Sequence, residues 1–194
     1  MNWYEKLSQY FPTQEMKTRA HMELLLKERG DIYHKDEGPY HVLMYAETPG
    51  FVFVDYIWVS AKARGQGIGH KLMAKLKQKG KPIILEVEPI DYEDSDTEKR
   101  LHFYKREDFE HASTIGYHSR SLRTQEVDTL EILYWSPGKE SEESIMEKMK
   151  QTYDKIHTFK DVQLYGESHD PVDDVLSIDP EATNDILEFD EPGA

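Results

Sequence analysis

The sequence predicts an α+β fold in which helices flank a largely antiparallel sheet. Two apolar stretches, Tyr40–Ala46 and Phe51–Val59, are separated by Thr48-Pro49-Gly50, which is the pattern of a hairpin. A glycine-rich turn and a helix then lead into a third apolar stretch, Ile83–Val87. Strands joined by a short turn, followed by strands that alternate with helices, indicate a mixed sheet covered by helical layers.

The N-terminal region predicts one helix over residues 14–29. Apolar residues recur there close to helical spacing, Thr13 is a candidate N-cap, and Gly30 is a candidate stop. Residues 31–36 are a weaker strand candidate, ended by the Gly38-Pro39 turn signal.

The middle of the chain carries the strongest signals. In the stretch 51–59 only Asp55 interrupts the apolar and aromatic residues, which is typical of a strand buried on both faces. Further elements follow in order: a helix over 70–79 ended by Gly80, a buried strand over 83–87, a helix over 97–105, strands over 109–117 and 130–135, and a peripheral helix over 141–156.

Charge divides the chain into a nearly neutral part and an acidic part. The net charge is −14, and the residues from Lys139 onward hold 5 basic and 16 acidic side chains, which leaves 19 basic and 22 acidic ones before them. We therefore expect a catalytic domain over 1–138 and a peripheral helical extension over 139–165. Residues 166–194 form an acidic tail that is either disordered or docked.

Composition also excludes several function classes. The chain has no Cys, so disulfides, thiolate catalysis and a Cys-based zinc site are ruled out, and its His residues form no metal-binding motif, so we expect no metal. A nearly neutral domain with an acidic tail argues against nucleic acid and anionic membranes as partners. No signal peptide pattern or membrane-length apolar run is present in the sequence, so the cytoplasm is the expected location.

The stretch that points to chemistry is the turn between the strand 51–59 and the helix 70–79. Gly65, Gly67 and Gly69 leave backbone amides open to a ligand, and the following helix adds the positive end of its dipole. This arrangement suits a pyrophosphate. A Walker loop requires Lys followed by Ser or Thr after its last glycine, and a dinucleotide fingerprint requires a different glycine spacing in a parallel unit, so both fit poorly.

The turn resembles the acyl-CoA motif of the GCN5-related N-acetyltransferase (GNAT) family. Arg64-x-x-Gly67-x-Gly69 matches [QR]-x-x-G-x-[GA] at its defining positions, and the segment 101–109 resembles a second family segment around Tyr104. Asp108 replaces the usual Gly, and Arg100 stands where a small residue is common. The resemblance covers about residues 1–136 and implies a GNAT-type sheet that splays open at the acyl-CoA site.

The resemblance also implies a reaction and its residues. Acetyl-CoA would be the cosubstrate, placed between the strands 51–59 and 83–87, and an amine would attack its thioester directly. The residues implied in acetyl-CoA binding are Ile57, Trp58 and Val59 along the pantetheine arm, and Arg64, Gly65, Gln66, Gly67, Ile68 and Gly69 around the pyrophosphate. Tyr104 would protonate the leaving thiolate.

The base that deprotonates the amine stays open between Glu86, Asp55 and a water relay. Several wider questions stay open as well. The acceptor is a small molecule or a protein, a homodimer is one oligomeric option, and a non-catalytic acyl-CoA sensor or interaction protein is the alternative function.

Overall fold

One sheet organises the fold. In the computed structural model, which describes residues 1–91 and 95–188, eight strands form a sheet in the order β1-β2-β3-β4-β7-β6-β8, with β5 paired to β7. The strands are β1 Tyr33–Gly38, β2 His41–Glu47, β3 Val52–Val59, β4 Ile83–Val87, β5 Glu110–His111, β6 Ile115–Arg120, β7 Val127–Trp135 and β8 Leu176–Ile178. The pair β3–β4 is parallel, whereas the other strand pairs are antiparallel.

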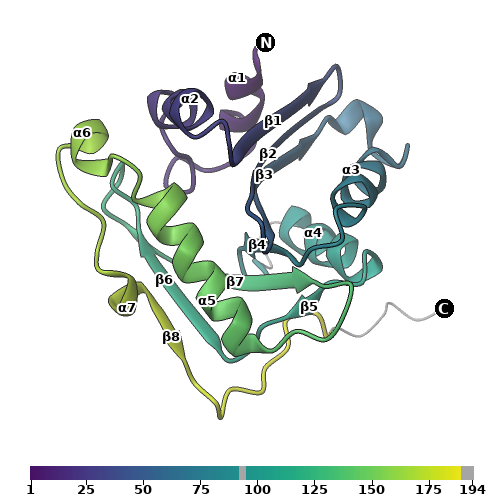
Figure 1. Cartoon of the computed structure of the whole chain (residues 1–194). Coiled ribbons are helices and arrows are strands. Elements are labelled where there is room, and N and C mark those ends of the chain that lie inside the picture. Colours follow the sequence, from purple (N-terminus) through teal and green to yellow (C-terminus); the bar gives the residue numbers. More distant parts are fainter. Residues whose placement is uncertain (92–94, 189–194) are drawn as a thin grey trace.

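Helices cover both faces of this sheet (Figure 1). One face packs against α1 Trp3–Ser8, α2 Arg19–Glu28 and α5 Glu142–Thr152, and the other packs against α3 Ile68–Lys77 and α4 Ser95–Arg106. Shorter helical turns are the 3₁₀ turn Ala61–Ala63, the π-helical turn Tyr153–His157, α6 Asp161–Tyr165 and α7 Val172–Val175.

The two faces create two hydrophobic cores because strand side chains alternate. In β2, Val42 and Met44 point to the core under α1, α2 and α5, whereas Leu43 points to the core under α3 and α4. All three side chains are fully buried, because β2 lies inside the sheet between β1 and β3.

The predicted helix over residues 14–29 is wrong in its first part. The helix α2 begins at Arg19, with Thr18 rather than Thr13 as its N-cap. The preceding backbone is held by tyrosines from elsewhere: the Tyr56 hydroxyl donates to the Glu15 carbonyl and accepts from the Lys17 amide, and the Tyr4 hydroxyl donates to the Lys17 carbonyl. These tertiary contacts satisfy backbone groups that a helix would otherwise pair.

The C-terminal region packs against the rest of the fold, and its described acidic segment follows the docked alternative that composition leaves open. Ile145 and Met149 of α5 are fully buried against the sheet. The acidic segment docks as well, because β8 pairs with β6 and Leu187 is buried under the face that carries α3 and α4. Residues 189–194 of the predicted tail lie outside the described residues.

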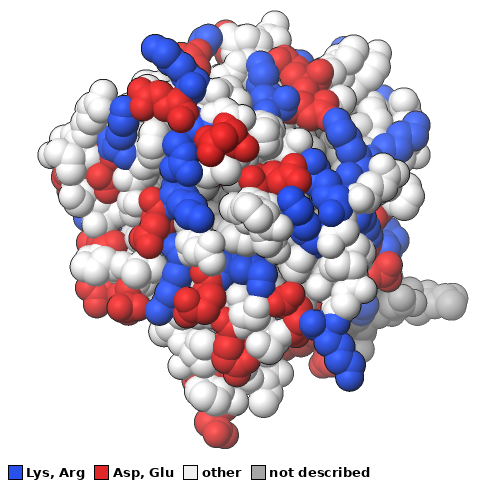
Figure 2. Space-filling model, in the orientation of Figure 1, with Lys and Arg blue, Asp and Glu red and all other residues white. Residues whose placement is uncertain are grey.

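Charge is mixed on the face seen in Figure 2. Lys and Arg side chains alternate there with Asp and Glu, so this face shows no extended basic surface. In the described part of the chain, no helix combines the length and the hydropathy that crossing a bilayer requires.

Candidate functional site

The site begins where β3 and β4 separate. Their parallel pairing runs from Val52 opposite Ile83 to Val54 opposite Leu85 and goes no further. Beyond this point β3 stays paired with β2 as far as Val59, and β4 stays paired with β7 as far as Val87. The two strands therefore diverge, and the strand edges that face each other are open to an extended ligand.

A β-bulge sits at the point of divergence. The register between β2 and β3 shifts after Met44, which pairs with Tyr56, to Tyr45, which pairs with Val54, so that Asp55 is the extra residue. Bulges of this kind redirect a side chain. Here Asp55 turns toward the core under α1 and α2, where the Tyr33 hydroxyl donates to it at 2.5 Å.

The glycine-rich turn forms an anion cradle at the start of α3. Gly65 and Gly67 have φ values of 80° and 72°, the left-handed region that favours glycine, and Gly67 is the N-cap of α3 without a side-chain cap. A Cβ at either position would meet nothing within 4 Å, so the space above the turn is free. The first-turn amides of α3 are consequently available to an anion.

Gly69 also allows close helix packing. A Cβ at this position would lie 3.0 Å from the ring of Phe103 in α4. The absence of a side chain therefore lets α3 approach the Phe103 ring of α4 closely.

A cavity of about 620 Å³ occupies the space between the diverging strands, the turn and α4. It is lined by most residues that the sequence predicts for acetyl-CoA binding, namely Ile57, Val59, Arg64, Gly65, Gly67, Ile68 and Gly69. The cavity lining also includes the three predicted catalytic residues Tyr104, Glu86 and Asp55. Its volume is that of a site for a small molecule or a cofactor.

Two predicted side chains point elsewhere. Trp58 packs against the core on the opposite face of the sheet, where the Lys6 ammonium lies 5.9 Å from the centre of its ring. Strand alternation explains this, because Ile57 and Val59 face the cavity side. The Gln66 amide donates to the Lys62 carbonyl. Neither side chain lines the cavity, so any contact from these residues would come from their backbone.

Tyr104 is a buried phenol on α4. It is 3% exposed, with the rings of Phe103 and Phe109 packed edge-on at 5.2 and 5.3 Å. Burial raises the pKa of Tyr104 to about 12, although the nearby Arg100 guanidinium opposes the shift. The side chain is therefore protonated at neutral pH and can act as a hydrogen-bond donor.

The replacement of the family glycine by Asp108 does not disturb the end of α4. Asp108 has φ 58°, so it adopts the left-handed conformation that a glycine would take, which Asp tolerates better than most residues. The next residue, Phe109, donates its amide to the Tyr104 carbonyl and packs on the Tyr104 ring. The departure in sequence thus preserves the local structure around Tyr104.

Asp55 is a fully engaged carboxylate. The Lys17 ammonium donates to one of its oxygens at 2.7 Å, and the Tyr33 hydroxyl donates to the other. Burial opposes ionisation, but Lys17, His157 and Tyr33 together outweigh it and hold the pKa of Asp55 below its ordinary value. A carboxylate with a lowered pKa and both oxygens occupied is a poor proton acceptor.

Glu86 has a different environment. It occupies the end of β4 beside the open edge, and the His157 Nε2 atom lies 2.8 Å from its Oε1 atom. The Tyr117 hydroxyl is adjacent as well, and its pKa is raised far above the ordinary value by burial and by the Glu86 charge. No cation of the Lys or Arg type is ion-paired with Glu86 in the described part of the chain.

A second, narrower cavity of about 120 Å³ lies on the other side of Glu86. Its lining includes Lys17, His21, Tyr117, Arg123 and His157. Five residues line both cavities, namely Phe11, Asp55, Tyr56, Glu86 and Arg100. The two cavities thus approach the same point from opposite sides, with Glu86 between them.

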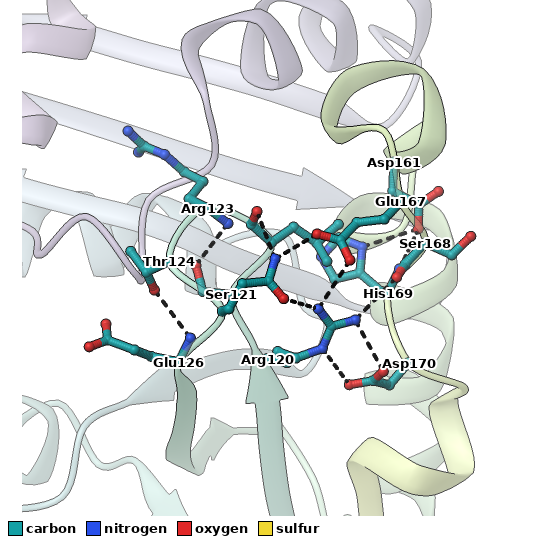
Figure 3. Close-up of polar contacts among 12 residues, drawn as sticks. Arg120, Ser121, Arg123, Thr124, Glu126, Asp161, Glu167, Ser168, His169 and Asp170 are labelled. Atoms are coloured by element: carbon teal, nitrogen blue, oxygen red, sulfur yellow. Dashed lines mark hydrogen bonds and ion pairs between the residues drawn. The ribbon is translucent and has the colours of Figure 1, made fainter.

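The hairpin between β6 and β7 contributes residues to the lining of this second cavity. Polar contacts hold the hairpin against the C-terminal segment (Figure 3). Arg120, at the end of β6, is bound by both carboxylate oxygens of Asp170 at 3.2 Å and also contacts Glu167 and Gln125. Arg123, at the hairpin tip, donates to the Met16 carbonyl. Acidic residues of the tail therefore fix the wall of the cavity.

Carboxyl groups also gather in this wall. Glu15 lies beside Glu88, and burial together with Glu88 raises the pKa of Glu15 to about 9. The Arg100 guanidinium is 3.6 Å from Glu88, and Asp128 lines the same cavity with a raised pKa, which results from burial and from Glu88. Glu15 is consequently uncharged at neutral pH.

Sequence reasoning missed Lys17, Tyr33 and His157. His157 follows directly after the predicted helix 141–156, and nothing in its sequence surroundings associates it with Glu86, from which it is separated by 71 positions. A contact between residues so far apart in the sequence can be identified only from the structure, in which the C-terminal segment packs on the sheet.

Comparisons with known proteins agree with the geometry. Residues 28–111 match the model of the acetyltransferase (GNAT) domain. The Bacillus subtilis (strain 168) protein named "Putative acetyltransferase YjbC" is 65% identical over 189 residues, which are 97% of this chain and 98% of that protein.

A solved structure of a protein from Bacteroides thetaiotaomicron, described as a GNAT-family acetyltransferase, has a TM-score of 0.55 and 19% identity, and the match covers 85% of this chain and 90% of that one. At this identity the likeness concerns the fold. The family model spans the diverging strands, the glycine turn and Tyr104, and the segment that carries His157 lies beyond it.

Proposed function

This chain belongs to the GNAT acetyltransferase family, and from that premise we propose that it transfers the acetyl group of acetyl-CoA directly to a primary amine. The observation that carries the proposal is the meeting of two cavities at Glu86, where β3 and β4 diverge. One cavity has the size for a cosubstrate, and the other approaches the same point from the opposite face.

The larger cavity is the proposed donor site. The amides of Gly65, Gly67 and the first turn of α3 would receive the pyrophosphate, because the start of α3 combines backbone donors with the positive end of a helix dipole. The amides of Arg64 and Gln66 donate to the carbonyls of Ala61 and Ala63. The open edge of β3, with Ile57 and Val59, would pair with the pantetheine arm. Arg64 stands at the rim of the cavity, paired with Asp96 at 3.1 Å.

The chemistry needs one proton acceptor and one proton donor. The amine nitrogen forms a bond to the thioester carbon, the carbon–sulfur bond breaks, and the amine loses a proton to the base. Burial disfavours a bare thiolate, so a hydrogen bond and then a proton from Tyr104 stabilise the leaving sulfur. Tyr104 remains protonated until that moment because its pKa is about 12.

Glu86 is the proposed base. Glu86 and Asp55 both line the two cavities, but the oxygens of Asp55 are taken up by the Lys17 ammonium and the Tyr33 hydroxyl. A carboxylate with a lowered pKa accepts a proton less readily, so the environment favours Glu86 over Asp55. If a water molecule relays the proton from the amine, Glu86 would be the group that finally accepts it.

The acceptor side favours a slender amine. Its cavity of about 120 Å³ is well below the volume of an ordinary drug-sized site, so the inserted group would be small, such as an alkylamine or a lysine side chain. His157, Tyr165 and His169 contribute to this cavity from beyond residue 138. We therefore treat the regions 1–138 and 139–165, together with the docked part of the tail, as one functional unit.

A turnover screen tests the function. The protein is incubated with acetyl-CoA and with amines of different classes, namely polyamines, aminoglycosides, amino acids and basic peptides, while free thiol and acetylated product are both measured. We expect equal amounts of thiol and product with at least one acceptor class, and loss of both in Glu86→Gln. Tight CoA binding without product in any class would identify a binding protein instead.

A further inference from the structure

We propose that His157 is a positioning residue that orients Glu86 and supports it as the proton acceptor. The inference rests on the proposed function of Glu86 and adds a residue from the C-terminal segment, outside the stretch that matches the family model. Four observations support it: the contact itself, the fixed imidazole ring, the backbone that presents it, and the charges around it.

The contact defines which atom carries the hydrogen. Nε2 of His157 lies 2.8 Å from Oε1 of Glu86, and when Glu86 is ionised, as the proposed base must be before it takes the proton, its oxygen can only accept and Nε2 is the donor. His157 is 8% exposed, which keeps water from competing for this hydrogen bond. The bond fixes one oxygen of Glu86, while the side chain still lines both cavities.

Aromatic neighbours fix the imidazole ring. Phe53 of β3 meets it edge-on at 5.5 Å with an interplanar angle of 89°, and Tyr153 lies 6.0 Å away at 62°. A ring that cannot rotate offers its donor in one direction only. The packing of the C-terminal segment on the sheet therefore determines the orientation of the Glu86 side chain.

The backbone presents His157 through a π-helical turn. Residues 153–157 leave the α-helical pattern of α5, and the Thr158 amide bonds to the Tyr153 carbonyl. Such turns change the direction in which side chains leave a helix and are frequent at functional sites. The carbonyl of Ile156 accepts from His21, whose pKa burial lowers to about 3, so that this anchor is uncharged at neutral pH.

The charges around the pair distinguish Glu86 from Asp55. The groups that face Glu86 and His157 come from several elements: Lys17 before α2, His21 on α2, Asp55 and Tyr56 on β3, Tyr117 on β6, Tyr153 on the π-helical turn and His169 after α6. Among these groups the Lys17 ammonium is ion-paired with Asp55. Glu86 is held instead by the hydrogen bond with the His157 imidazole, which occupies one of its oxygens.

The test replaces His157 by Gln, which keeps a donor, and by Phe, which removes it. His111→Phe is the matched control, because His111 is also 8% exposed and bonded to a carboxylate, Glu131, at 2.9 Å, but does not line either cavity. The titration of Glu86 is followed by NMR in protein carrying ¹³C-labelled glutamate, with the signal assigned through Glu86→Gln. This readout does not require turnover.

We expect His157→Phe to move the Glu86 titration, and the acidic limb of the kcat/KM profile, to higher pH, because burial without a donor favours the neutral acid. Turnover should fall about 10–100-fold, while His157→Gln keeps the titration and most of the activity. In the double variant His157→Phe/Glu86→Gln, the loss should be no larger than in Glu86→Gln alone, because His157 acts through Glu86.

An unmoved Glu86 titration in His157→Phe, or a double variant whose losses add in full, would overturn this inference alone. A wild-type protein that acetylates no amine would overturn the proposed function, whatever the titration shows. If the acidic limb of the kcat/KM profile moved equally in His111→Phe, the shift would be a general effect of destabilisation. This result would also contradict the assignment of His157 as a positioning residue.

Discussion

Substitution of Gly67 by Glu tests the anion cradle, and the fold supplies its own control at Gly80. Both glycines have positive φ, 72° and 66°, and a Cβ would meet nothing within 4 Å at either position. A left-handed conformation costs a non-glycine residue about 1–2 kcal/mol. Gly67→Glu and Gly80→Glu should therefore lose similar stability, which corresponds to roughly 2–8 °C in Tm for a chain of this size.

Only Gly67 lies in the cradle. A carboxylate there would fill the space above the turn and repel the pyrophosphate, and two or three hydrogen bonds to a charged group, at about 1.5–3 kcal/mol each, would be lost. We expect CoA affinity in calorimetry to fall about 10²–10⁶-fold in Gly67→Glu and to stay within about threefold of wild type in Gly80→Glu. Equal CoA affinity in the two variants would refute the cradle.

Three further predictions follow from the environments of buried side chains. Tyr104→Phe should lower kcat by about 10²–10⁴-fold with little change in CoA affinity, and wild-type turnover would leave Tyr104 with a packing role. Asp55→Asn should leave Lys17 buried without its counterion and lower the free energy of unfolding by about 3–5 kcal/mol in chemical denaturation, whereas an unchanged unfolding curve would contradict a structural ion pair. Glu15 has a pKa of about 9 in the fold, above its ordinary 4.5, so its contribution to stability is present below pH 4.5 and is lost as pH rises toward 9. Glu15→Gln should therefore be stabilising relative to wild type at pH 9 but not at pH 4, in thermal melts at both pH values, and a difference independent of pH would refute the shift.

The sequence predicts the elements that are determined locally. The strand 83–87 is found with its predicted bounds, and the glycine-rich turn opens a helix as expected, because apolar runs and left-handed glycines act over a few residues. The helix over 14–29 failed in its first part, since Tyr56 and Tyr4 hold that backbone from elsewhere in the fold.

Only part of the candidate site can be predicted from local sequence patterns. A lone carboxylate in an apolar strand made Asp55 a candidate base, but the partner that decides its role, Lys17, is 38 positions away. The bulge that redirects Asp55 depends on the register with β2, which no local pattern reports. His157 reaches Glu86 only because the C-terminal segment packs back on the sheet, a long-range contact that no local sequence pattern indicates.

A crystal structure with bound CoA is the measurement that tests the central claim most directly. We expect the pyrophosphate against the amides of residues 64–69, the pantetheine arm along the open edge of β3 at Ile57 and Val59, and the sulfur close to Tyr104 on the side of the cavity that faces Glu86. CoA bound elsewhere, or with its sulfur directed away from Glu86 and Tyr104, would contradict the account.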